Sequence, residues 1–121
     1  IVASRPNARY PYAPQMEPTT MINPKIMDYS SELVKDWEGC LSIPGVRGMV
    51  PRSKSISVEY LDRNGKAVRA DYEDFVARIV QHEVDHLDGI TFLDRMDSTK
   101  DIVMEREFQK ILARQKELRP G

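Results

Sequence analysis

The chain has two histidines, His82 and His86, and they lie around Glu83 in the pattern His-Glu-Val-Asp-His. In a helix, residues four apart lie one turn apart on the same face, so both imidazoles can reach one metal ion. Glu83 follows the first histidine directly, where its carboxylate can take a proton from water without ligating the metal. The pattern therefore predicts two metal ligands and a general base. The alternative is an ordinary amphipathic helix whose histidines lie on its polar face.

The only cysteine, Cys40, is the candidate third ligand. A Cys-His-His set leaves one position of a tetrahedral metal ion open, which is typical of catalytic sites, whereas a structural site is usually closed by a fourth ligand. No further Cys or His is present to close the site, although an Asp or Glu could do so. The alternative is a structural thiol in the core, which is a common fate of a lone cysteine.

Length and composition predict one soluble domain over residues 1–121. The chain has 18 basic and 19 acidic side chains and is 40% hydrophobic, so its charge gives no argument for a nucleic-acid or membrane partner. It has no apolar run of the about 18 residues needed to span a bilayer. A lone cysteine fits a reducing compartment, and no signal-peptide pattern opens the chain. Because residue 1 is Ile, we expect a fragment or a trimmed product.

The histidine pattern lies in an apolar-periodic run that predicts a helix over residues 74–87, ended at Gly89. Apolar residues occur on more than one side of this helix, so we expect it to be central and largely buried, with Glu83 in a dry setting. Before it, residues 55–61 and 66–72 predict a hairpin, and Asn64-Gly65 favours a type I′ turn.

The remaining segments give weaker signals. Residues 4–18 are rich in proline and predict an ordered loop. Residues 19–26 favour a strand in which Pro24 marks an edge, a bulge or a strand end. After the central helix, residues 97–100 offer N-cap candidates for a last helix that runs to about residue 118 and packs by one face.

Two stretches together resemble a known family. Glu-Gly-Cys-Leu-Ser at 38–42 and Gln-His-Glu-Val-Asp-His-Leu at 81–87 are similar to the paired motifs of peptide deformylase. The resemblance implies an α+β fold with antiparallel sheets around a central metal-binding helix and a C-terminal helix. It implies removal of the N-formyl group from the initiator methionine of new polypeptides, with release of formate. It also implies one divalent metal ion per chain, Fe²⁺ in the cell, with Zn²⁺, Ni²⁺ or Co²⁺ able to replace it.

The resemblance assigns a role to each matching position. The metal ligands would be Cys40, His82 and His86. Glu83 would act as general base and then acid, and the backbone N–H of Leu41 would bind the formyl oxygen. The substrate would be bound by the side chains or backbone of Glu38, Gly39, Arg47, Phe75 and Ile79, of which Phe75 and Ile79 would surround the methionine side chain.

One family motif has no counterpart in this sequence. The family carries Gly-x-Gly-x-Ala-Ala-x-Gln near its N-terminus, and its glutamine donates to the same oxygen. Gln15 lacks the preceding glycines, so we do not assign it that role. Removal of one such donor costs other enzymes about a hundred- to a thousandfold in rate. The sequence therefore predicts a single deformylase-like domain that lacks the family's N-terminal segment.

Three functions follow from these residues. The first is a deformylase that acts in the cytoplasm, as a monomer, on formyl-methionyl nascent polypeptides, at the ribosome or free of it; an organellar or viral origin stays open. The second is a metallopeptidase, which is disfavoured because zinc peptidases usually take a carboxylate or a third histidine as the remaining ligand. The third is an inactive metal-binding remnant.

Overall fold

The computed structural model describes residues 2–4, 14, 16–40 and 43–118. The chain divides into two compact units. The first unit comprises Ile1–Val34 and Arg52–Ile90, and the second unit comprises Lys35–Pro51 and Thr91–Gly121. Each unit combines antiparallel strands with a helix, which confirms the predicted α+β class.

The sheet of the first unit has the order β3-β6-β7. Its strands are β3 (Ile22–Tyr29), β6 (Ser55–Leu61) and β7 (Ala67–Glu73), all paired antiparallel. A separate ribbon pairs β1 (Val2–Ser4) with β2 (Met16–Thr19), so the end of the predicted loop over 4–18 is a strand. The strand predicted around Pro24 is confirmed as edge strand β3, whose register shifts between Ile22 and Lys25.

The predicted hairpin over 55–72 is confirmed, but its turn type is wrong. A type I′ turn needs positive φ at both central residues, and here Gly65 has φ +79° while Asn64 is not among the positive-φ residues. Gly65 N–H donates to the Asp62 carbonyl at 2.9 Å, and the Asp62 carboxylate accepts from the N–H groups of Asn64 and Lys66, each at 2.9 Å. The aspartate therefore organises a wider turn in which only glycine adopts the left-handed conformation.

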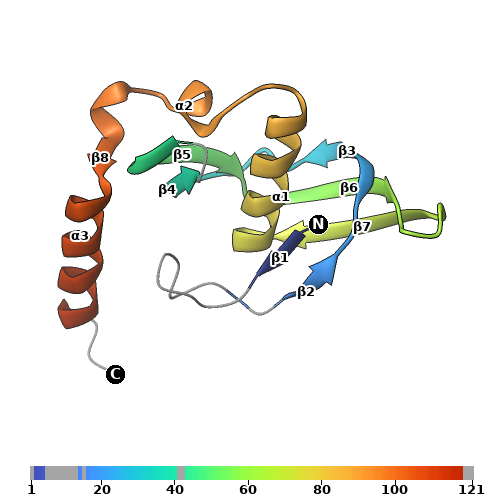
Figure 1. Ribbon diagram of the computed structural model, residues 1–121, viewed down its shortest axis with the longest axis horizontal. Coiled ribbons are helices and arrows are strands. Elements are labelled where there is room, and N and C mark those ends of the chain that lie inside the picture. Colours follow the sequence, from blue (N-terminus) through green and yellow to red (C-terminus); the bar gives the residue numbers. More distant parts are fainter. Residues whose placement is uncertain (1, 5–13, 15, 41–42, 119–121) are drawn as a thin grey trace. The chain divides into compact units, whose positions relative to one another are not determined.

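Helix α1 (Asp74–Leu87) has the predicted bounds. Figure 1 shows it beside the β3-β6-β7 sheet. The core between them contains Ile56 and Val58 from β6, and Ala77 and Val80 from α1, all at most 3% exposed. The helix ends where predicted, because Gly89 adopts φ +74° and its N–H donates to the His86 carbonyl at 3.1 Å.

The sheet of the second unit has the order β4-β5-β8. It consists of β4 (Leu33–Cys40), β5 (Ile43–Ser53) and β8 (Ile102–Met104). Two helices also belong to this unit, α2 (Phe92–Arg95) and α3 (Glu105–Leu118), with a 3₁₀ turn, η1 (Thr99–Asp101), between them. The core of this unit contains Cys40, Val50 and Phe92.

The last helix starts later than the sequence predicts. Ser98 is an N-cap, but its side chain accepts from Lys100 N–H and caps η1 instead of α3. Ile102 and Val103, which fit the helical stripe, form strand β8 opposite Gly48 and Arg47 of β5. Pairing with this strand satisfies their backbone groups, so tertiary structure overrides the local helical pattern. The predicted end near residue 118 is confirmed.

Candidate metal centre

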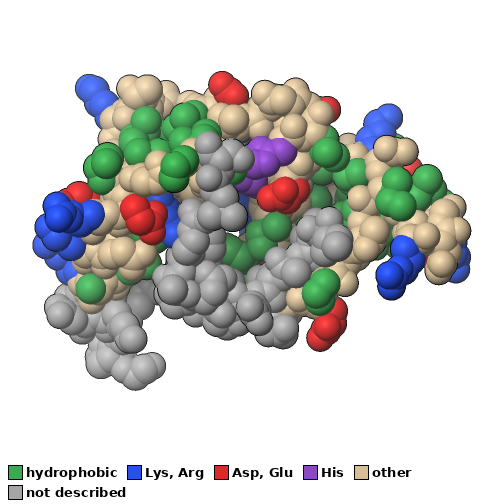
Figure 2. Space-filling model, in the orientation of Figure 1, with side chains coloured by type: hydrophobic (Ala, Val, Ile, Leu, Met, Phe, Trp, Pro, Cys, Tyr) green, Lys and Arg blue, Asp and Glu red, His purple; other side chains and the backbone are tan. Residues whose placement is uncertain are grey.

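Helix α1 presents the two histidines of the chain side by side. The ring centroids of His82 and His86 are 4.5 Å apart, and the ring planes are tilted by 54°. Both side chains are half-buried, and histidine atoms are visible at the surface in Figure 2. The helix therefore brings two imidazoles together where they remain accessible, as the spacing predicted.

Glu83 lies in a setting different from the one predicted. Its side chain is exposed, and Leu87 one turn further on is 69% exposed. Helix α1 is buried along one face only, by Ala77, Arg78, Val80, Gln81 and Asp85. We expected a largely buried helix with Glu83 shielded from water, and this expectation is wrong. Three of the five buried residues are polar, so the apolar surface of the helix is narrower than the sequence suggested.

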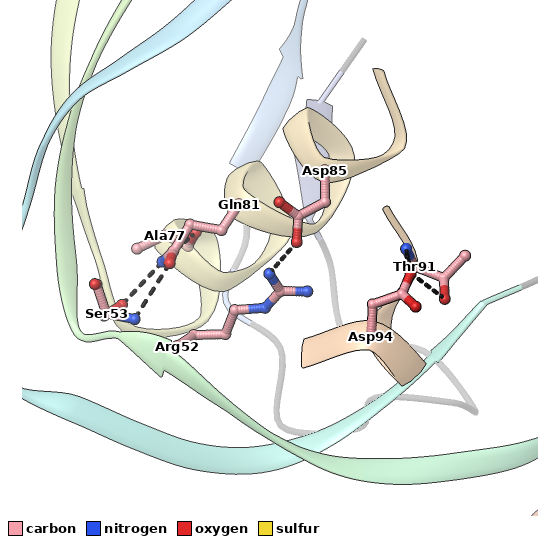
Figure 3. A network of polar contacts seen from close by, with 7 residues as sticks. All are labelled: Arg52, Ser53, Ala77, Gln81, Asp85, Thr91 and Asp94. Carbon is pink, nitrogen blue, oxygen red and sulfur yellow. Dashed lines mark hydrogen bonds and ion pairs between the residues drawn. The ribbon is translucent and has the colours of Figure 1, made fainter. Parts of the chain in front are cut away.

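The buried polar residues of α1 bind the end of strand β5 (Figure 3). Asp85 accepts from Arg52, with 2.5 Å between Oδ2 and Nη1. Gln81 accepts from Ser53 N–H at 3.2 Å and donates to the carbonyls of Ser53 at 2.9 Å and Ala77 at 3.1 Å. All of these residues belong to the first unit.

Sequence reasoning missed these contacts. Gln81 and Asp85 occur inside the histidine motif, but we assigned roles only to the residues that resemble ligands and a base. A signal was present, because two polar residues at i and i+4 interrupt an apolar helix face. Their partner on β5 could not be found without the fold, since Arg52 and Asp85 are 33 residues apart in the sequence.

Cys40 is the last residue of β4 and is 8% exposed. Its side chain belongs to the core of the second unit with Val50 and Phe92. The chain has no second cysteine, so no disulfide can form within it. Cys40 belongs to the second unit and the two histidines to the first, and each of the three side chains offers one atom of a kind that ligates metal ions.

The predicted substrate positions on α1 lie on one stripe with the histidines. Phe75, Ile79, His82 and His86 follow the i, i+4, i+7 and i+11 spacing of a single helix face. Phe75 and Ile79 are both half-buried, and Ile79 packs against the core of the first unit. An apolar side chain could therefore lie against the same face of α1 that presents the imidazoles.

The predicted positions around Cys40 differ in accessibility. Leu41 lies outside the described residues, and so does Gln15. Glu38 is 3% exposed and Gly39 is half-buried, both in β4. The roles of these residues in binding substrate stay predictions.

Arg47 is held inside the second unit. Its side chain is fully buried, and its Nε and Nη2 donate to the Glu105 carboxylate at 2.8 and 3.2 Å. The guanidinium carbon also lies 4.0 Å from the ring centroid of Phe108. These contacts already fix the guanidinium, so a contact of Arg47 with substrate would use its backbone or require the side chain to leave Glu105.

Comparison with known proteins decides the family. The family model for polypeptide deformylase matches residues 1–101, which is most of the chain. This chain belongs to the polypeptide deformylase family. The family is metal-dependent, which agrees with the donor types of Cys40, His82 and His86.

Relatives of this chain are similar to it over most of its length. Peptide deformylase 2 of Nostoc sp. is 58% identical over 114 residues, which cover 94% of this chain and 64% of the relative. Peptide deformylase 2 of Shewanella oneidensis is 47% identical over 107 residues, which cover 88% of this chain and 59% of the relative. The chain thus spans less than two thirds of the length of these curated relatives.

Solved deformylases share the fold. The class I type b peptide deformylase of Acinetobacter baumannii, bound to Met-Ala-Ser, superposes with a TM-score of 0.76 at 53% identity over 78% of this chain and 60% of that one. The Thermotoga maritima enzyme superposes with a TM-score of 0.63 at 40% identity over 64% of this chain and 53% of that one. No helix in the described part of this chain is long and apolar enough to cross a membrane.

Proposed function

We propose that this chain is the metal-binding catalytic part of a peptide deformylase, which removes the N-formyl group from the initiator methionine of new polypeptides and releases formate. The observation that carries the proposal is the histidine pair on α1, with Glu83 directly after His82. Membership of the polypeptide deformylase family supports it. We further propose that the substrates are formyl-methionyl nascent chains in the cytoplasm, free or at the ribosome, and that the protein acts as a monomer.

The donor chemistry fits a divalent transition metal. Cys40, His82 and His86 would hold one ion, and thiolate with imidazole suits Zn²⁺, Fe²⁺, Co²⁺ and Ni²⁺. We propose Fe²⁺ in the cell, with the other three able to replace it. When bound, such an ion acts as a Lewis acid toward a carbonyl oxygen and lowers the pKa of a water molecule.

Glu83 would move the proton. Its carboxylate would accept a proton from the attacking water and then donate it to the leaving amine of methionine. The carboxylate is exposed and lies one residue, about 100° around the helix, from the His82 position. The side chain can therefore reach solvent and substrate without being a ligand.

The remaining groups would bind and orient the formylated methionine. The backbone N–H of Leu41 would donate to the formyl oxygen, where negative charge develops during attack. Phe75 and Ile79 would contact the methionine side chain along the histidine face of α1, while Glu38 and Gly39 would line the path of the peptide. Arg47 would contact the peptide further along through its backbone, since its side chain is buried against Glu105.

A peptide panel tests the proposed class of reaction. The protein is loaded with Ni²⁺ or, without oxygen, with Fe²⁺, and is given either N-formyl-Met-Ala-Ser or Met-Ala-Ser. A deformylase releases formate from the first peptide and leaves the second intact. Free methionine from Met-Ala-Ser would instead indicate a metallopeptidase. No product from either peptide, with one metal ion bound per chain, would indicate a remnant that retains the metal site without the activity.

A further inference from the structure

Residues 52–54, which comprise the end of β5 and the residue between β5 and β6, contact α1 at three points. The Lys54 carbonyl accepts from Asp74 N–H, in the first turn of the helix, at 2.8 Å. Two turns later, Ser53 exchanges hydrogen bonds with the Gln81 side chain. One turn after that, Arg52 pairs with Asp85. As the segment runs backwards from residue 54 to 52, its contacts advance along the helix toward the histidines.

Gln81 and Asp85 are each the residue directly before a histidine. They are four residues apart and share one helix face, and His82 and His86 share the face about 100° further around. A rotation of this part of α1 about its axis would thus move both imidazoles by the same angle. Contacts that fix the direction of Gln81 and Asp85 fix the direction of the histidine pair.

The contacts of Gln81 define one orientation of its amide. The side chain is 5% exposed, its oxygen accepts from Ser53 N–H, and its nitrogen donates to the carbonyls of Ser53 and Ala77. A carboxylate of the same shape could accept from the N–H, but it would face two carbonyl oxygens without a proton to donate. The site therefore requires an amide at position 81.

We propose that Gln81 and Asp85 are positioning residues that hold the metal-binding histidines in place from the neighbouring, buried face of α1. With Arg52 and Ser53 they form a clamp at two points, one turn apart, between α1 and the end of β5. This inference rests on the proposed metal site but not on the reaction that the site performs.

The clamp also contributes to stability, so the test must separate positioning from folding. Three variants alter the clamp: Gln81→Met, Gln81→Glu and Asp85→Asn. Two controls lie in the same unit. Val58→Ala removes buried volume from the core against α1, and Asp28→Asn breaks the exposed pair with Arg69, whose side chains are 71% and 57% exposed.

The measurement is Co²⁺ binding, followed by visible absorption and by competition with a chelator of known affinity. It is made at a temperature where thermal melts show that every metal-free protein is folded. We expect the clamp variants to bind Co²⁺ about ten- to a hundredfold more weakly, with a changed absorption spectrum, as is typical when groups behind metal ligands are altered. The two controls should keep the wild-type affinity and spectrum. Clamp variants with wild-type affinity and spectrum would overturn the proposal.

A double variant separates the two roles further. Arg52→Met with Asp85→Leu removes both charges, so neither is left buried without a partner, and the melting temperature of the metal-free protein should recover relative to Asp85→Asn. If the pair positions His86, the Co²⁺ spectrum should remain altered despite this recovery. Full return of the spectrum together with the melting temperature would show a role in stability alone.

The Co²⁺-binding test of the clamp does not depend on whether the protein releases formate. Wild-type protein that binds Co²⁺ but releases no formate would contradict the proposed function and leave the clamp intact. Wild-type protein that binds no Co²⁺ would contradict both. Altered turnover in the clamp variants, without any change in Co²⁺ binding, would overturn the clamp and leave the proposed function standing.

Discussion

The Arg52 guanidinium donates to the Asp85 carboxylate inside the first unit, where the two side chains are only 5% and 10% exposed. A buried pair of this kind is expensive to break from one side, because the remaining charge has lost both water and its partner. We expect Asp85→Ala to lower the free energy of unfolding by about 3 kcal/mol or more. Urea unfolding of the metal-free protein measures this loss, with Asp28→Ala as the control. Equal effects of the two substitutions would contradict a buried pair.

The aromatic cluster of the second unit gives a second prediction. Phe108 is fully buried, its ring lies edge-on to Trp37 with 5.8 Å between centroids, and the Arg47 guanidinium covers it. We expect Phe108→Ala to lower the free energy of unfolding by about 3 kcal/mol or more, because the cavity cannot fully collapse around a fixed guanidinium. The fluorescence of Trp37, the only tryptophan, follows the transition.

Met104, four residues before Phe108, provides an exposed control for the Phe108→Ala substitution. Met104 is 59% exposed at the end of β8, so Met104→Ala should change the free energy of unfolding by no more than about 0.5 kcal/mol. If the loss for Phe108→Ala were as small as the loss for Met104→Ala, Phe108 would not be a core residue.

The sequence predicted the parts of this fold that depend on local pattern. The bounds of α1 and the strands of the hairpin follow from hydrophobic periodicity and from Gly89, and the structure confirms them. The start of α3 was wrong, because Ile102 and Val103 pair with a strand more than 50 residues earlier. No local sequence pattern indicates that residues 102–103 pair with β5.

In the candidate site, too, some features follow from the local sequence and others depend on the fold. The metal ligands and the base were assigned from residue types and spacing, and their roles stay predictions. The contact of Arg52 with Asp85 could not be predicted, because nothing in the sequence around Arg52 marks it. The two residues come together only when the end of β5 packs against α1. The exposure of Glu83 also depends on which helix face is buried, and here Gln81 and Asp85 take part of the face that apolar residues were expected to fill.

Tyr72 provides a prediction on pH. Burial raises the pKa of Tyr72 to about 12 from its usual value of 10.0, and Tyr60 beside it adds to the shift. Below pH 10 this tyrosine is protonated in both the folded and the unfolded protein, so it adds no pH dependence. Between pH 10 and 12 the unfolded chain loses the proton first, so the free energy of unfolding should fall as the pH rises.

Urea unfolding at pH 9 and pH 11 measures this decrease. Tyr72→Phe removes the titrating hydroxyl, so its free energy of unfolding should fall less between the two pH values than that of the wild type. An identical pH dependence of wild type and Tyr72→Phe would assign the alkaline loss of stability to other groups.

Cys40 provides a prediction on the metal. If its thiolate is a ligand, Co²⁺-loaded wild type should show a sulfur-to-metal charge-transfer band that Cys40→Ser lacks. The variant should also lose more affinity than the about ten- to hundredfold expected for groups behind the ligands. Metal binding should stabilise the wild type by about 4 kcal/mol at a free concentration a thousand times the Kd. A wild-type spectrum without the band would remove Cys40 from the ligand set.

The most direct test of the account is formate release from N-formyl-Met-Ala-Ser by wild type and Glu83→Ala, with the bound metal measured in each sample. Glu59→Ala, an exposed glutamate on β6, is the matched control. We predict that all three proteins bind one metal ion per chain, that wild type and Glu59→Ala release formate, and that Glu83→Ala is slower by about a hundred- to ten-thousandfold. Formate release by Glu83→Ala at the wild-type rate, or none by metal-loaded wild type, would contradict the account.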